Sequence, residues 1–143
     1  MRLERRFRII LYGIFAALFA TGAAWLIANQ LKDAPRGELW QQISANLLMA
    51  HGGAAMVALL LLGALGPVHV KRGWRTRRNR VTGALMVTLN SVLILTAFAL
   101  YYLASESFRP WMSDIHLALG LGLPAFLLSH VWIGKRDKSR ERR

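Results

Sequence analysis

The stretch "LLMAHGGAAMVALLLLGALGPVHVKRGW", residues 47–74, decides the fold class because it is apolar over nearly its whole length. Three other runs are similar, and the four cover approximately residues 9–29, 45–70, 81–104 and 112–134. A helix needs about 20 apolar residues to cross a bilayer. Its backbone polar groups must be satisfied within the segment, so helices are expected. We predict an all-α protein whose 143 residues form a single integral membrane domain.

The connections between these runs are short, which favours a four-helix transmembrane bundle with up-down-up-down topology. In such a bundle the second and fourth helices run in the same direction. They lie diagonally across the core if neighbours in sequence are also neighbours in space. No stretch remains for a soluble domain, so a flavin or nicotinamide site is not expected.

The net charge of +12 is arranged in blocks that predict a topology. Sixteen Lys and Arg residues lie before the first run, between the second and third runs, and after the fourth, against three in the other two loops. This positive-inside pattern predicts a bacterial inner-membrane protein with both termini cytoplasmic. Because topology accounts for the charge, nucleic acid is not an expected partner, whereas anionic membrane lipid is.

Cysteine is absent from the chain. This excludes disulfides, iron–sulfur clusters and covalently attached c-type haem. The first run has a basic start, like a secretory signal peptide, but it is longer than the usual signal core of about 7–15 residues. We therefore expect it to be retained as a membrane helix.

All four histidines of the chain lie in the second and fourth runs, at His51, His69, His116 and His130. His51 and His69 are 18 residues apart, or five turns of a regular helix at about 3.6 residues per turn. His116 and His130 are 14 residues apart, which leaves them within about 40° of each other. On parallel helices this spacing predicts two cross-bundle pairs. His51 and His116 lie near the outer side, and His69 and His130 near the inner side.

Two imidazoles that face each other from separate helices fit the axial positions of a six-coordinate b-type haem. Such a site also needs small residues where the porphyrin edge meets the backbone. The second run supplies Gly52, Ala55 and Ala58, and the fourth supplies Gly120, Gly122 and Ala125. We therefore predict that the four histidines are axial ligands of haem iron.

Other interpretations of these polar residues stay open. Zinc would need further ligands, and only Asp114 lies nearby. Histidines in membrane helices also act as interfacial anchors, packing donors or proton relays. In the third run, Asn90, Ser91, Thr88 and Thr96 either form interhelical hydrogen bonds or support a cofactor. The alternative function is that of a cofactor-free small membrane protein, either a transporter subunit or an assembly factor.

The histidine pattern resembles that of the bacterial membrane-bound b-type cytochromes, the four-helix di-haem group that includes the cytochrome b-561 type and the N-terminal bundle of respiratory cytochrome b. The segment "HLALGLGLPAFLLSH", residues 116–130, has the family's thirteen residues between ligands. The stretch "ALYYLASESFRPWMSDIHLALGL", residues 99–121, is also similar to small cytochrome b-like proteins. The resemblance implies electron transport through two bis-histidine haems. It also implies exchange with quinone, quinol or a redox partner protein, and is compatible with quinone oxidoreductase activity.

The second run departs from the family pattern. Its histidines are four residues further apart than those of the fourth run, which adds about 6 Å of rise. Pro67 removes a backbone donor and can kink the helix just before His69. The sequence therefore favours the outer pair over the inner one and leaves one haem or two open.

Candidates for a quinone site lie at both surfaces. The outer surface offers Tyr101, Tyr102, Glu106, Arg109 and Trp40, and the inner surface offers the arginine-rich loop. Each aromatic residue among them also fits an ordinary interfacial anchor, and each charge fits the topology.

Overall fold

The computed structural model describes residues 4–32, 35, 37–75, 79–103 and 105–140. Within these ranges the chain is helical and contains no strand. Four helices are long and apolar enough to cross a membrane: α1 (Arg5–Gln30), α2 (Gly37–Leu65), α4 (Arg80–Tyr102) and α5 (Arg109–Arg140). The chain is therefore an all-α, multi-pass membrane protein, which confirms the predicted fold class.

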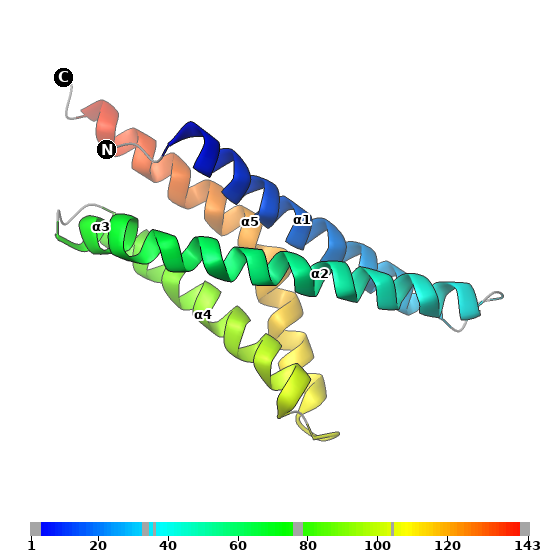
Figure 1. The fold of residues 1–143 in the computed structure, drawn as a ribbon. Helices are drawn as coiled ribbons and strands as arrows, with labels where there is room; N and C mark the ends of the chain where they lie inside the picture. The colour runs from blue at the N-terminus through cyan, green and yellow to red at the C-terminus, as the bar shows by residue number, and fades with distance from the viewer. Residues whose placement is uncertain (1–3, 33–34, 36, 76–78, 104, 141–143) are drawn as a thin grey trace. The chain divides into compact units, whose positions relative to one another are not determined.

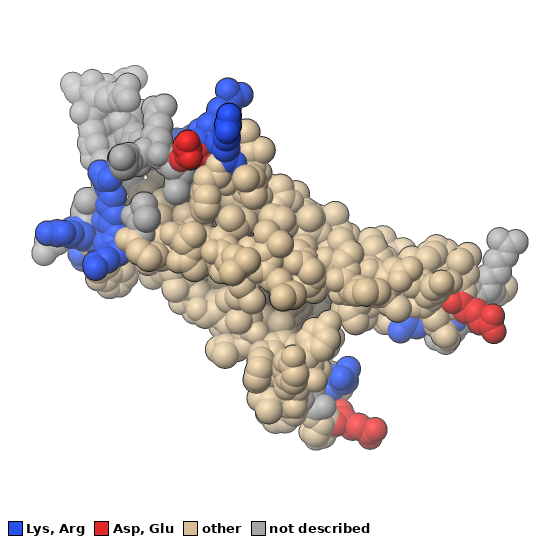
Figure 2. Space-filling view, viewed as in Figure 1, with Lys and Arg blue, Asp and Glu red and all other residues tan. Residues whose placement is uncertain are grey.

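The helices extend beyond the apolar runs that predict them. α2 begins at Gly37 instead of about residue 45, because the polar segment "GELWQQIS", residues 37–44, is helical too. α5 likewise continues to Arg140 through the basic end of the chain. Long polar side chains at the end of a membrane helix can reach water while their stems cover apolar surface. On the face drawn in Figure 2, the charged side chains accordingly gather at the helix ends.

The second apolar run does not form one regular helix. α2 ends at Leu65, a π-helical turn spans Gly66–Val70, and the short helix α3 (Lys71–Arg75) follows. The α-helical hydrogen-bond ladder breaks here because Pro67 has no N–H and Gly66 is a poor helix former. The prediction that His51 and His69 share a face assumed a regular helix. That assumption is wrong, because a π-helical turn changes the rotation per residue.

The chain divides into two compact units, Met1–Leu65 and Gly66–Arg143. In the first unit α1 packs along α2, and the two helices form a hairpin (Figure 1). In the second unit α4 packs on α5, while α3 contacts both the π-helical turn and α4.

Side-chain contacts show that α4 and α5 are antiparallel. Thr96 of α4 contacts His116 of α5, and Thr82 of α4 contacts His130 of α5. A step of 14 residues forward along α5 therefore matches a step of 14 residues back along α4. This register places one histidine of α5 beside each end of α4.

Candidate functional site

His51 lies on the side of α2 that contacts α1. Its Nδ1 is 3.0 Å from the hydroxyl oxygen of Thr21, and that hydroxyl donates to the carbonyl oxygen of Ala17 at 2.7 Å. A Cβ atom added to Gly22 would lie 3.3 Å from Cε1 of His51. The helix α1 therefore contacts this imidazole through the Thr21 hydroxyl, and the missing side chain of Gly22 leaves room for the ring.

His116 is held in the same way in the second unit. Its Nδ1 is 2.9 Å from the hydroxyl oxygen of Thr96, a residue of α4 that is only 5% exposed. The Thr96 hydroxyl donates to the carbonyl oxygen of Val92, one turn earlier, at 2.8 Å. The sequence left open whether Thr96 forms an interhelical hydrogen bond or supports a cofactor. The interhelical hydrogen bond is confirmed.

His130 repeats the arrangement at the other end of the α4–α5 hairpin. Its Nδ1 is 3.0 Å from the hydroxyl oxygen of Thr82, which lies 3.3 Å from the carbonyl oxygen of Asn79. Asn79 precedes α4 with a left-handed backbone, φ 48° and ψ 35°. A Cβ atom on Gly134 would lie only 2.9 Å from Nδ2 of Asn79. One turn after His130, glycine thus permits the close approach of the segment that leads into α4.

His69 lies in the π-helical turn, and the structure brings it to His130. The centroids of the two imidazole rings are 6.3 Å apart, and the ring planes are inclined by 81°. Arg80 at the start of α4 donates from Nε and Nη2 to the carbonyl oxygen of Trp74, at 3.1 and 2.8 Å. These bonds tie α3, and through it the π-helical turn, to the hairpin that carries His130.

The spacing of this pair fits two imidazoles bound to one iron. A metal–nitrogen bond is about 2 Å long, and a ring nitrogen lies roughly 1.2 Å from the centroid of a five-membered ring with bonds of about 1.3–1.4 Å. Two rings that bind one iron through Nε2 from opposite sides therefore have centroids about 6 Å apart. The separation of 6.3 Å between His69 and His130 agrees with this value. The same separation also falls within the range of a direct edge-to-face contact between two rings.

Zinc, the other metal considered from the sequence, would need side-chain ligands in addition to a histidine pair. Across the described parts of the chain, no group of three or more His, Cys, Asp or Glu side chains is arranged to hold a metal ion. Asp114, the nearby acidic residue considered for zinc, is exposed near the start of α5.

The small residues predicted to face a porphyrin edge have mixed surroundings. Ala58 is buried, whereas Ala125 is exposed. A Cβ atom on Gly120 would find its nearest neighbour, a methyl group of Leu93, at 4.0 Å, and one on Gly122 would lie 3.4 Å from the ring of Phe126. Gly120 is therefore the roomier of the two glycines in α5.

The sequence reasoning missed two residues that contact histidines, Thr21 and Thr82. A signal for Thr82 was present, because Thr82 and Thr96 are 14 residues apart, as are His116 and His130. In an antiparallel hairpin, equal intervals place two such pairs side by side. By contrast, Asn90 donates to the carbonyl oxygen of Met86 in its own helix.

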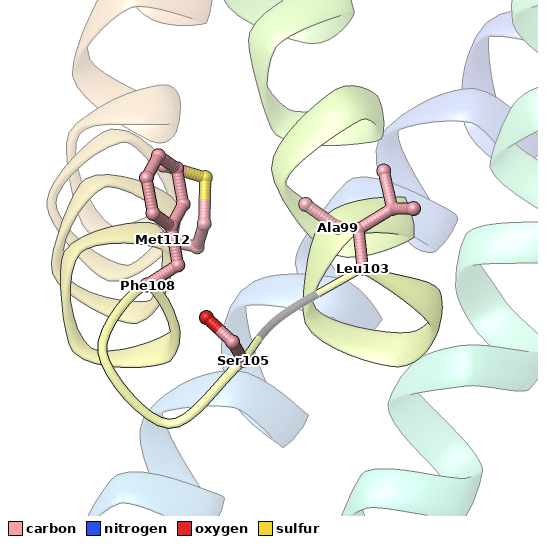
Figure 3. A pocket seen from close by; sticks show the side chains of 5 residues that line it. All are labelled: Ala99, Leu103, Ser105, Phe108 and Met112. Atoms are coloured by element: carbon pink, nitrogen blue, oxygen red, sulfur yellow. The ribbon is translucent and has the colours of Figure 1, made fainter.

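A pocket of about 320 Å³ opens at the turn between α4 and α5. It is lined by Ala99, Leu103, Ser105, Phe108 and Met112 (Figure 3). The lining is mostly apolar, and the Ser105 side chain carries a hydroxyl at its edge (Figure 3). Since residues four apart share a helix face, the Met112 side of the pocket lies one turn from His116.

The residues that the sequence offered for a quinone site are not those of this pocket. Tyr101 and Tyr102 are 63% and 75% exposed, as interfacial anchors are. Arg109 donates to the carbonyl oxygen of Leu100 at 3.2 Å, which closes the turn. Trp40 belongs to the first unit and lies near the start of α2.

The structure brings together two of the four predicted ligands. His69 and His130 lie together in the second unit, whereas His51 and His116 belong to different units, and their pairing stays a prediction. The fold and these contacts define a multi-pass helical membrane protein whose histidines are held between helices. Comparison of the chain with protein-family models, with curated proteins and with solved structures finds no match.

Proposed function

We propose that the chain is a membrane-bound b-type cytochrome that carries electrons across or within the bilayer. The observation that carries the proposal is the pair formed by His69 and His130, whose ring centroids are separated as two axial ligands of one iron would be. His51 and His116 would hold a second haem. When bound, haem supplies a one-electron iron couple, whose potential depends on its axial ligands, on hydrogen bonds and on burial.

The contacts of the histidine Nδ1 atoms support ligation through Nε2. In metalloproteins the nitrogen that does not bind the metal usually donates its proton to an oxygen acceptor, which fixes the tautomer. In this chain His51, His116 and His130 each have Nδ1 at 2.9–3.0 Å from a threonine hydroxyl. A threonine hydroxyl oxygen can accept this proton, so the three contacts are compatible with ligation through Nε2.

The positions of the ligands along α5 suit transfer between the two faces of a membrane. His116 and His130 are 14 residues apart, which corresponds to a rise of about 21 Å. The hydrocarbon core is about 30 Å thick. Two haems at these levels would therefore lie one near each face. The charge pattern supports an inner-membrane location with both termini cytoplasmic, so His130 would lie on the cytoplasmic side.

Quinone or quinol in the bilayer, or a redox partner protein, would exchange electrons with these haems. The pocket at the α4–α5 turn supports a quinone site, because its volume of about 320 Å³ reaches the lower range of small-molecule pockets. Its apolar lining suits the ring, and the Ser105 hydroxyl can donate to a quinone oxygen. The pocket lies one turn from the contact between Thr96 and His116, next to the predicted outer haem.

The test is the haem content of the purified full-length chain, measured by pyridine haemochrome and by reduced-minus-oxidised spectra. We expect two b haems per chain. Substitution His69→Ala or His130→Ala should remove one haem, whereas Ser129→Ala should remove none. Ser129 is the matched control because it neighbours His130, is exposed, and donates to the carbonyl oxygen of Ala125 in its own helix.

A colourless protein would contradict the proposal and favour the cofactor-free alternative. The contact between His69 and His130 would then be an edge-to-face ring pair, for which centroid separations of about 4.5–7 Å are usual. If the haem content of the wild type is unchanged in both His69→Ala and His130→Ala, this pair is not a haem site.

A further inference from the structure

Three threonines contact the histidines through a shared geometry. Each threonine lies on the helix next to its histidine and also bonds back to a carbonyl oxygen of its own helix or of the residue at its start. The pairs are Thr21 with His51, Thr96 with His116, and Thr82 with His130. Threonine commonly bonds to the carbonyl oxygen of the preceding turn in helices. That a threonine with this bond also contacts Nδ1 of three of the four histidines needs a further explanation.

The hydrogen bonds favour one position for the proton on two of the imidazoles. A carbonyl oxygen only accepts, and the hydroxyl contacts to it are the shorter ones, 2.7 Å from Thr21 to Ala17 and 2.8 Å from Thr96 to Val92, against 3.0 and 2.9 Å to the histidine Nδ1. This geometry favours donation of the single hydroxyl proton to the carbonyl, and the hydroxyl oxygen then accepts from a proton on Nδ1. A neutral imidazole with its proton on Nδ1 carries its lone pair on Nε2. For Thr82 the order is reversed, with 3.3 Å to Asn79 and 3.0 Å to Nδ1 of His130, so Thr82 joins the set through its contact with His130.

We propose that Thr21, Thr82 and Thr96 are positioning residues that orient their histidines and hold them in the tautomer that binds iron through Nε2. This inference rests on the haem function proposed above. Each hydroxyl restrains rotation of its ring, so that a ligand is already aimed before haem binds. Its oxygen, polarised by donation to a carbonyl, also accepts more strongly from the N–H of the ligand. With haem bound, this bond would make the imidazole a more electron-rich ligand and would lower the potential of the haem.

The first experiment replaces the hydroxyl of Thr96 by a methyl group in the full chain. Thr96→Val keeps the shape of the side chain and removes the acceptor, and Thr96→Ser restores the acceptor. Thr88→Val is the matched control, because Thr88 is an exposed residue of the same helix. We expect Thr96→Val to weaken haem binding about 10- to 100-fold. It should also raise the potential of one haem, while Thr96→Ser and Thr88→Val stay near wild type.

The second experiment reads the tautomer directly in the haem-free chain. Two-bond couplings between nitrogen and ring protons in chain with ¹⁵N-labelled histidine distinguish a proton on Nδ1 from one on Nε2. We expect His116 of the wild type to be protonated on Nδ1, and Thr96→Val to shift it toward the Nε2 form. A helix-packing role alone would change the stability of the chain but would move neither the tautomer nor the potential.

The outcomes separate this inference from the proposed function. If wild type binds haem but Thr96→Val has unchanged affinity, potential and tautomer, the positioning role is refuted and the haem function stands. A proton on Nε2 of His116 in the haem-free wild type would also refute it. If wild type binds no haem at all, the proposed function fails and the positioning role fails with it.

Discussion

The glycines of α1 provide a direct test of how His51 is held. Substitution Gly22→Ala adds a methyl group 3.3 Å from Cε1 and 3.5 Å from Nδ1 of His51, and the first separation is shorter than an ordinary contact of 3.4–4 Å. The imidazole must therefore move by a few tenths of an ångström, which disturbs its 3.0 Å contact with the Thr21 hydroxyl. Gly13 in the same helix is the matched control, since an added Cβ there meets nothing within 4 Å.

The magnitude follows from two opposing effects. Alanine is favoured over glycine within a helix by roughly 1 kcal/mol, and this gain applies to both substitutions. At Gly22 it is opposed by overpacking, about 1–3 kcal/mol, and by a weakened hydrogen bond between Thr21 and His51, about 1 kcal/mol. Because the gain cancels in the comparison, we expect Gly22→Ala to be about 2–4 kcal/mol less stable than Gly13→Ala.

The assay is unfolding of the full chain in mixed micelles with increasing sodium dodecyl sulfate, followed by circular dichroism. Gly22→Ala should unfold at a lower detergent fraction than Gly13→Ala. A double mutant that adds Thr21→Val should show non-additive losses, because both changes act on His51. Equal midpoints for Gly22→Ala and Gly13→Ala, with additive behaviour in the double mutant, would refute the packing of His51 against α1.

Three further predictions concern topology, packing and ligation. Reporter fusions after residues 36 and 108 should report the periplasm because the sixteen basic residues flank the opposite ends of the helices; cytoplasmic activity at either would contradict the topology. Gly134→Ala should lower the unfolding midpoint more than Gly120→Ala, since an added Cβ lies 2.9 Å from Asn79 in the first case and 4.0 Å from its nearest neighbour in the second; a reversed order would argue against this packing. His116→Ala should remove one haem while the protein still inserts, because alanine suits a helix; full haem content with unchanged spectra in both this variant and His51→Ala would rule out an outer site.

Much of the candidate site was visible in the sequence because its residue types are rare in apolar segments. A histidine within a membrane helix needs a polar partner or a function, so the sequence alone, with four histidines in two apolar runs, indicated a site. The threonines were harder to single out, since threonine is an unremarkable residue in such a helix. Only the 14-residue interval of Thr82 and Thr96, matched to that of His116 and His130, could have marked two of them.

The sequence by itself determined the class and the spans of this protein. The length of an apolar run, set against the thickness of a bilayer, is a local property, and so is the excess of basic residues in alternate loops. α1 and α4 accordingly begin and end within a few residues of the predicted runs. The errors lie at the polar start of α2, which is helical from Gly37, and at the polar end of α5.

Only the tertiary structure decided how the imidazoles are held. The π-helical turn at Gly66–Val70 ends the regular spacing from His51 and carries His69 to within 6.3 Å of His130, between ring centroids. The sequence ranked this pair below the outer one, because the longer interval in the second run and the expected kink at Pro67 left the direction and depth of His69 unspecified. Contacts between helices depend on the register of the two helices. They also depend on where a glycine leaves room for a neighbouring side chain, as Gly22 does for His51. Such contacts join residues far apart in the chain, and no local pattern encodes their distances.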